Sequence, residues 1–162
     1  MKFAALLCVL GTATVLAAEP EYPKVGPDIY DAQADGTVQI AAALKQAKAE
    51  SKTVLLDFGA NWCPWCHKLE TLFTTDAAIA AQLKDGFVLV LIDVNMRHGV
   101  KRNFAVNEKY GNPIHEGLPV LVVLDADGRQ LTTQETGALE DGKDGHDPAK
   151  VAAFLRRWAP KR

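Results

Sequence analysis

The sequence has no basic stripe and no arginine cluster, and its 18 Lys and Arg residues nearly balance 20 Asp and Glu residues, for a formal net charge of −2. A nucleic-acid-binding domain concentrates positive charge on one face, so this composition argues against nucleic acid as a partner. An acidic partner-binding tail is also missing, as are internal repeats. A chain of 162 residues without a second domain is most simply one globular unit.

Cysteine is scarce, with only three in the chain, and the first of them falls in a leader-like segment. Cys8 lies within the apolar run Phe3–Leu16, which is followed by the small residues Ala17 and Ala18. This pattern predicts a signal peptide over residues 1–18, cleaved after Ala17 or Ala18. The run is shorter than the ~20 residues of a membrane-spanning helix, although an uncleaved anchor is the alternative. We therefore expect a periplasmic protein with no membrane segment after cleavage.

The other two cysteines form the motif Cys63-Pro64-Trp65-Cys66. The apolar run Thr53–Phe58 precedes the motif and an amphipathic run follows it, an order that predicts strand, turn, dithiol and helix. Cys63 would lie at the first turn, where free N–H groups and the helix dipole favour a thiolate. Such a thiolate can attack a disulfide, and Cys66, on the same face, can resolve the mixed disulfide. Pro64 suits the start of the helix.

Two segments resemble the thioredoxin superfamily, especially its small periplasmic thiol–disulfide oxidoreductases. Asp57–Cys66, which reads Asp-Phe-Gly-Ala-Asn-Trp-Cys-Pro-Trp-Cys, is similar to the family's strand-to-active-site segment. Gly117–Leu124 is similar to the segment in which an apolar residue and a cis-proline, here Leu118 and Pro119, start a core strand beside the dithiol. The resemblance extends over roughly residues 37–158.

The resemblance implies a thioredoxin-like α/β fold: a mixed central sheet, with parallel strands plus a C-terminal antiparallel hairpin, and helices on both faces. About 28 residues separate Thr53–Phe58 from the next apolar strand, Phe87–Val94, enough for a crossover between parallel neighbours. Residues 19–36, with three prolines, are expected to be an extended lead-in to a domain over residues 37–162. The remaining patterns predict helices over 38–50, 63–73, 77–83, 100–110 and 148–158, strands over 119–124 and 129–135, and a surface loop over 137–147.

The resemblance also implies roles for individual residues. Asp57 would lie behind the dithiol and assist proton transfer at Cys66, and the backbone of Leu118 would pair with an extended substrate segment. The family often supplies a lysine from the adjacent strand, but Phe87–Val94 contains none. His67 is expected to have a modest electrostatic effect on the dithiol. The expected substrate-binding residues are Trp62, Pro64, Trp65, Leu118 and Pro119.

Three other functions fit parts of the same pattern. Cys63 to His67 also reads Cys-x-x-Cys-His, a haem-attachment pattern whose second axial ligand would come from Met96, His98, His115 or His146. Two thiolates and a histidine could instead carry Cu(I). An exported binding or chaperone-like protein could hold a static disulfide, although so small a loop constrains the unfolded chain little.

The patterns together predict a monomeric enzyme that exchanges thiols and disulfides with protein substrates. Cys63 would attack, Cys66 would resolve, and Asp57 would manage a proton. The reaction needs no cofactor and no metal, but an unidentified redox partner must recycle the pair. A reductase, an oxidase and an isomerase share these residues, so the direction of electron flow stays open.

Overall fold

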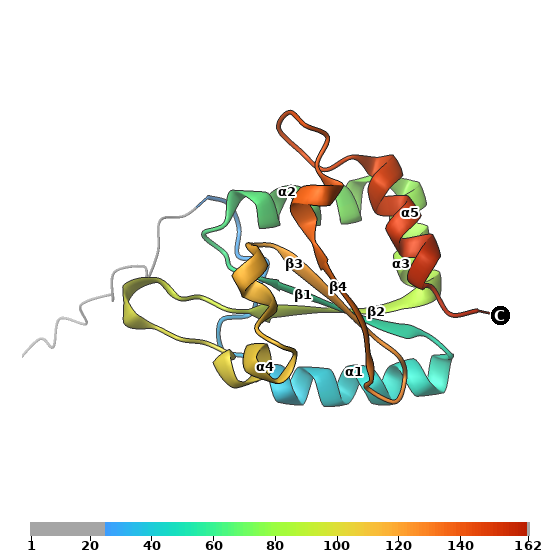
Figure 1. The fold of residues 1–162 in the computed structure, drawn as a ribbon, viewed down its shortest axis with the longest axis horizontal. Helices are drawn as coiled ribbons and strands as arrows, with labels where there is room; N and C mark the ends of the chain where they lie inside the picture. Colours follow the sequence, from blue (N-terminus) through green and yellow to red (C-terminus); the bar gives the residue numbers. More distant parts are fainter. Residues whose placement is uncertain (1–24, 162) are drawn as a thin grey trace, which may run out of the picture.

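A computed structural model describes residues 25–161 and contains one four-stranded sheet in the order β2-β1-β3-β4 (Figure 1). β1 (Thr53–Gly59) runs parallel to β2 (Phe87–Asp93) and antiparallel to β3 (Val120–Leu124), which pairs antiparallel with β4 (Gln130–Glu135). The sheet is therefore mixed, with one parallel pair and a C-terminal hairpin. This arrangement confirms the predicted fold class.

Helices cover both faces of the sheet. α1 (Gly36–Glu50) and α4 (Phe104–Lys109) lie on one face, below the sheet in Figure 1. On the other face lie α2 (Pro64–Thr75), α3 (Ala77–Gly86) and α5 (Pro148–Trp158). Two hydrophobic clusters fill the two spaces between the sheet and these helix layers.

β1 is buried along its whole length and supplies side chains to both clusters. Val54, Leu56 and Phe58 pack toward α1, and Leu55 packs on the α2 side. Because successive side chains of a strand point to opposite faces, Asp57 follows Leu55 to the α2 side. The only carboxylate in β1 therefore lies under the helix that begins beside the dithiol.

Helix caps fix where the main helices begin. Asp35, Asp76 and Asp147 accept hydrogen bonds from the first free N–H groups of α1, α3 and α5. α2 differs, since its N-cap is Cys63, whose sulfur accepts from the backbone N–H of Cys66. Cys63 thus occupies the position where α1, α3 and α5 have an aspartate.

Three segments differ from the sequence-based expectation. The predicted helix over 100–110 is only the short α4, preceded by a one-turn helix, η1 (Arg97–Gly99). Within the predicted loop over 137–147 there is another short helix, η3 (Thr136–Leu139), and a bridge between Glu140 and His146, whose side chain is buried rather than solvated. The described part of the lead-in packs against the domain through Tyr30, which is 2% exposed.

Another short helix, η2 (Pro113–Glu116), leads into β3. The predicted signal peptide lies outside the described residues. Between residues 25 and 161, no helix combines the length and the apolar character needed to cross a lipid bilayer.

Candidate dithiol site

The end of β1 and the start of α2 bring the two predicted cysteines together. The backbone N–H of Cys66 donates to Cys63 Sγ at 3.3 Å, and the Cys63 thiol contacts the carbonyl oxygen of Leu118 at 3.6 Å. Both sulfurs are free thiols, with Cys63 4% exposed and Cys66 fully buried. Cys63 is therefore the less enclosed of the two, and an incoming disulfide would reach it first.

The two thiols differ in their affinity for a proton. The pKa of Cys63 is lowered, chiefly by a hydrogen bond from the Cys66 thiol and further by the backbone N–H groups of Cys66 and Trp65, against the opposing effect of burial. The pKa of Cys66 is strongly raised, first by burial and then by its donation to Cys63 and the nearby charge of Asp57. Negative charge thus settles on Cys63, which is the nucleophile that disulfide exchange needs.

Asp57 is fully buried behind the dithiol. Burial raises its pKa to about 7, although a hydrogen bond from Tyr30 Oη to Asp57 Oδ1, at 3.0 Å, works in the opposite direction. Its other oxygen, Oδ2, has no hydrogen-bond partner among the described residues. A carboxyl group with a pKa near neutrality can both take up and release a proton.

The segment before β3 completes the exposed side of the site. The Leu118–Pro119 peptide bond is cis, which the sequence could not reveal. Pro119 is buried, and Thr136 Oγ1 donates to its carbonyl oxygen at 2.5 Å. Leu118 is half-buried and packs against the cluster that contains both cysteines. The predicted substrate-binding pair therefore lies directly beside Cys63.

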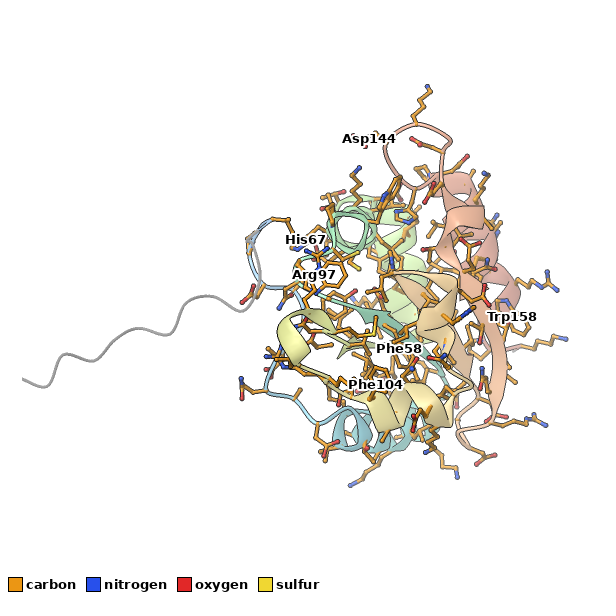
Figure 2. All side chains as sticks on the ribbon, turned by 60° about the vertical axis from the view of Figure 1, so that its left-hand side comes forward. Phe58, His67, Arg97, Phe104, Asp144 and Trp158 are labelled. Carbon is orange, nitrogen blue, oxygen red and sulfur yellow. The ribbon has the colours of Figure 1, made fainter. Side chains whose placement is uncertain are left out.

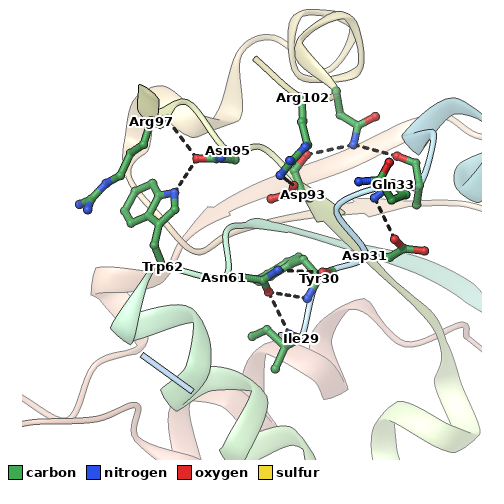
Figure 3. A network of polar contacts seen from close by, with 12 residues as sticks. Ile29, Tyr30, Asp31, Gln33, Asn61, Trp62, Asp93, Asn95, Arg97 and Arg102 are labelled. Carbon is green, nitrogen blue, oxygen red and sulfur yellow. Dashed lines mark hydrogen bonds and ion pairs between the residues drawn. The ribbon is translucent and has the colours of Figure 1, made fainter. Parts of the chain in front are cut away.

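The two tryptophans are each held by a residue from elsewhere in the fold. Trp62 Nε1 donates to Asn95 Oδ1 at 2.8 Å, and the Arg97 guanidinium lies 3.9 Å from the Trp62 ring centroid, as Figure 3 shows. On the other side, Trp65 meets the ring of His146 edge-on, with centroids 5.5 Å apart. Both tryptophans remain half-buried next to the dithiol, and they flank the exposed Pro64.

Lys68 links α2 to the loop that follows η3. Its Nζ lies 4.4 Å from the Trp65 ring centroid and pairs with Asp144, a residue on the loop that projects from the molecule in Figure 2. His146, in the same loop, has no hydrogen-bond partner at either ring nitrogen among the described residues. The loop that was expected to be only solvated therefore reaches back to the active-site tryptophan.

Sequence reasoning missed a polar clamp that joins the lead-in to the site. Asn61 Oδ1 accepts from the backbone N–H groups of Ile29 and Tyr30, at 2.9 and 2.8 Å, and Asn61 Nδ2 donates to the Tyr30 carbonyl at 2.9 Å (Figure 3). A ring nitrogen of His67 contacts the Asn61 carbonyl at 2.8 Å. His67 therefore supports the turn before the dithiol. No spacing in the sequence links Tyr30 to a site about 30 residues later.

Metal-binding and haem-binding alternatives depend on further ligands. Within residues 25–161, no three His, Cys, Asp or Glu side chains gather in a way that could hold a metal ion. Of the four possible axial haem ligands, Met96 and His115 are exposed and His146 is buried against Trp65. The fourth, His98, has a side chain outside the described set.

The mixed sheet, the dithiol at a helix N-cap, the buried carboxylate and the cis-proline define a thioredoxin-like protein. A sequence model of a thioredoxin-like family matches residues 34–126, more than half of the chain. The chain therefore belongs to the thioredoxin-like family. This membership confirms the resemblance found in the sequence.

Relatives and solved structures agree with this assignment. The thiol:disulfide interchange protein DsbD of Actinobacillus pleuropneumoniae is 32% identical over 106 residues, which cover 64% of this chain but 17% of the relative. The DsbD of Ralstonia nicotianae is 31% identical over 99 residues, covering 61% and 15%. The chain thus spans only about a sixth of the length of these curated relatives.

Among solved structures, a disulphide isomerase from Xylella fastidiosa Temecula1 is 32% identical, with a TM-score of 0.69, and the match covers 80% of this chain and 95% of that one. The C-terminal domain of Neisseria meningitidis DsbD in its oxidised form, 23% identical with a TM-score of 0.54, covers 77% and 97% and shows the shared fold.

Proposed function

We propose that this protein catalyses thiol–disulfide exchange on protein substrates through Cys63 and Cys66. The observation that carries the proposal is the asymmetry of the pair. Cys63 sits at the helix N-cap with a lowered pKa and is 4% exposed, whereas Cys66 is fully buried with a raised pKa. Family membership and the disulphide isomerase relative support the same reaction class.

The reaction would run in two steps. The Cys63 thiolate attacks one sulfur of a substrate disulfide, and the other substrate sulfur leaves as a thiolate that takes up a proton. Asp57 then accepts the Cys66 proton, and the Cys66 sulfur attacks Cys63 Sγ, which releases the second substrate thiol. The substrate gains two electrons and the protein becomes a disulfide. In the reverse direction the protein disulfide oxidises a substrate dithiol.

The surroundings of Cys63 would hold an extended polypeptide. The backbone of Leu118, beside Cys63, offers hydrogen-bonding groups to a substrate strand, and Pro119 orients that backbone. Trp62, Pro64 and Trp65 form an apolar rim suited to unfolded segments. These five residues are the proposed substrate-binding set.

We further propose the cellular setting that the sequence predicted. Residues 1–18 would be a cleaved signal peptide, residues 19–36 a lead-in, and residues 37–162 the thioredoxin-like domain. The protein would act as a monomer in the periplasm and be recycled by a separate redox partner. The support is the leader pattern at the start of the sequence.

Trapping of substrates tests the exchange mechanism. In the Cys66→Ala variant the first step proceeds and the second cannot, so mixed disulfides through Cys63 should accumulate with exported proteins and disappear on reduction. The Cys63→Ala variant, which keeps the buried thiol, is the matched control and should trap almost nothing. Absence of mixed disulfides in Cys66→Ala, or equal trapping by both variants, would contradict the proposal.

A further inference from the structure

Tyr30 brings an unexpected hydroxyl group to the dithiol. It belongs to the segment before α1 and lies outside residues 34–126, the part of the chain that matches the family. Its side chain is 2% exposed and packs in one cluster with Cys63 and Cys66. Asn61 Oδ1 accepts from the backbone N–H groups of Ile29 and Tyr30, and Asn61 Nδ2 donates to the Tyr30 carbonyl, so the turn that carries the dithiol also holds the Tyr30 backbone in place.

The hydroxyl of Tyr30 lies close to both the carboxylate and the resolving thiol. Tyr30 Oη donates to Asp57 Oδ1 at 3.0 Å. A Cβ atom built on Gly59 would lie 2.1 Å from Tyr30 Oη and 2.8 Å from Cys66 Sγ. The Tyr30 hydroxyl and the Cys66 sulfur therefore both pack against Gly59, on the face of β1 that also carries Asp57.

The hydrogen bond from Tyr30 makes the two oxygens of Asp57 unequal. Oδ1 is occupied, and Oδ2 is buried with no hydrogen-bond partner within residues 25–161. A buried carboxylate oxygen without a partner is costly, and such oxygens in native structures generally have a task. Of the two oxygens, Oδ2 has both lone pairs available to take a proton from the neighbouring thiol.

We propose that Tyr30 is a positioning residue for the second step of exchange: it holds Asp57 Oδ1 so that Oδ2 is the oxygen that takes the Cys66 proton. This inference rests on the proposed function. The proton moves from Cys66 Sγ to Asp57 Oδ2, the new bond joins Cys66 Sγ to Cys63 Sγ, and the bond between Cys63 and the substrate sulfur breaks. Tyr30 keeps its own proton throughout.

Among the groups around Asp57, Tyr30 is the one that stabilises the ionised form of the carboxylate. The ionisable groups that face it are Tyr30 from the lead-in and the two cysteines at the start of α2. Its neighbours in the sheet, Leu91 of β2 and Leu121 of β3, are apolar. Removal of the hydroxyl should therefore raise the pKa of Asp57 above its value of about 7.

The rate of resolution by Cys66 can be measured directly from the release of a chromophore in two phases. Dithiobis-nitrobenzoate reacts with Cys63 and releases one nitrothiobenzoate; resolution by Cys66 then releases the second. In Tyr30→Phe the first phase should be unchanged. The second phase should slow about fivefold at about pH 7 and about tenfold one unit lower, because its pH midpoint moves up by about one unit.

The matched control is Tyr110→Phe. Tyr110 is also buried, at 5% exposure, but its ring packs edge-on against Phe58 on the opposite face of the sheet. This variant should leave both phases and the pH midpoint unchanged. Thermal unfolding of the reduced proteins checks that both variants are folded.

Combination with Asp57→Asn separates positioning from packing. If Tyr30 acts through the carboxylate, then Tyr30→Phe should change the second phase by less than about twofold in the Asp57→Asn background. A wild-type second phase in Tyr30→Phe, or an equal slowing with and without Asp57, would overturn the inference. Failure of the proposed function is a different result, since the Cys66→Ala variant would then trap no protein.

Discussion

The backbone N–H of Cys66 points at the sulfur of Cys63 across 3.3 Å, so the first turn of α2 stabilises negative charge on one cysteine of the pair. The same turn places Cys66 over Gly59, behind the first thiol and away from solvent. The helix therefore distinguishes the attacking sulfur from the resolving sulfur before any substrate arrives.

Alkylation should reveal this asymmetry. In the reduced protein near neutral pH, iodoacetamide should modify Cys63 at least about tenfold faster than Cys66, because the thiolate is the reactive form. The pH midpoint for Cys63 should fall below the ordinary thiol value of about 8.5. Mass spectrometry of digested protein after short labelling gives both rates. Equal labelling of the two cysteines would contradict the assignment of Cys63 as nucleophile.

Asp57 should make the folded state less stable as the pH rises. Its folded pKa, about 7, is raised above the ordinary value of 3.8, so between these values the folded state binds more protons than the unfolded state. The stability contributed by Asp57 should therefore fall from about pH 4 to about pH 7, by on the order of 4 kcal/mol, and then level off. Urea unfolding of the reduced protein measures this.

The Asp57→Asn variant is the control for that pH dependence. Asparagine does not titrate. The unfolding free energy of the variant minus that of wild type should therefore rise from about pH 4 to about pH 7 and stay constant above that. A wild-type slope that persists in the variant would assign the effect to another group.

Gly59 should tolerate no side chain. A Cβ would lie 2.1 Å from Tyr30 Oη and 2.8 Å from Cys66 Sγ, so Gly59→Ala must displace the tyrosine, the thiol or the strand. We expect a loss of about 2–3 kcal/mol in unfolding free energy and slower resolution by Cys66. Gly145→Ala, whose Cβ would meet nothing closer than Asp141 at 3.7 Å, should change neither quantity. Equal stability of the two variants would show that the crowding at Gly59 is relieved without cost.

His146 should produce a pH dependence of the opposite sign. Burial lowers its pKa and nearby Lys68 adds to this, while Asp141 opposes it. Because the unfolded state binds a proton at this histidine more readily, the stability contributed by His146 should fall as the pH drops through the ordinary histidine value of 6.5. His146→Phe keeps an aromatic ring against Trp65 and should remove this acid-side loss, as followed by thermal unfolding. A loss unchanged in the variant would exclude His146 as its source.

Much of the fold could be predicted because its signals are local. The continuous apolar runs gave β1 and β2 and their parallel pairing, and helical periodicity gave α1, α3 and α5. The dithiol and its position at the start of α2 followed from strand, turn and helix patterns alone. These strands, helices and the dithiol position depend on residues close together in the sequence, so local patterns are enough to predict them.

The polar contacts around the dithiol could not be predicted, because they join distant segments. Tyr30 meets Asp57 across 27 positions, and Asn95 meets Trp62 across 33. Tyr30 lies in a Pro-containing stretch with no periodicity, which predicted only an extended lead-in, and His146 lies in a Gly-rich stretch, which predicted a surface loop. Burial decided their roles, and burial of single side chains in irregular segments leaves no pattern in the sequence.

The reduction potential of the Cys63–Cys66 pair tests the central claim most directly. It is measured by equilibrating the protein in thiol–disulfide redox buffers and quantifying both forms. A pair that exchanges with protein substrates should have a potential between about −270 mV, as in a reductant, and about −120 mV, as in a disulfide donor. A potential well below about −300 mV would mean a structural disulfide, and the assignment of Cys63 and Cys66 as an exchange site would be wrong.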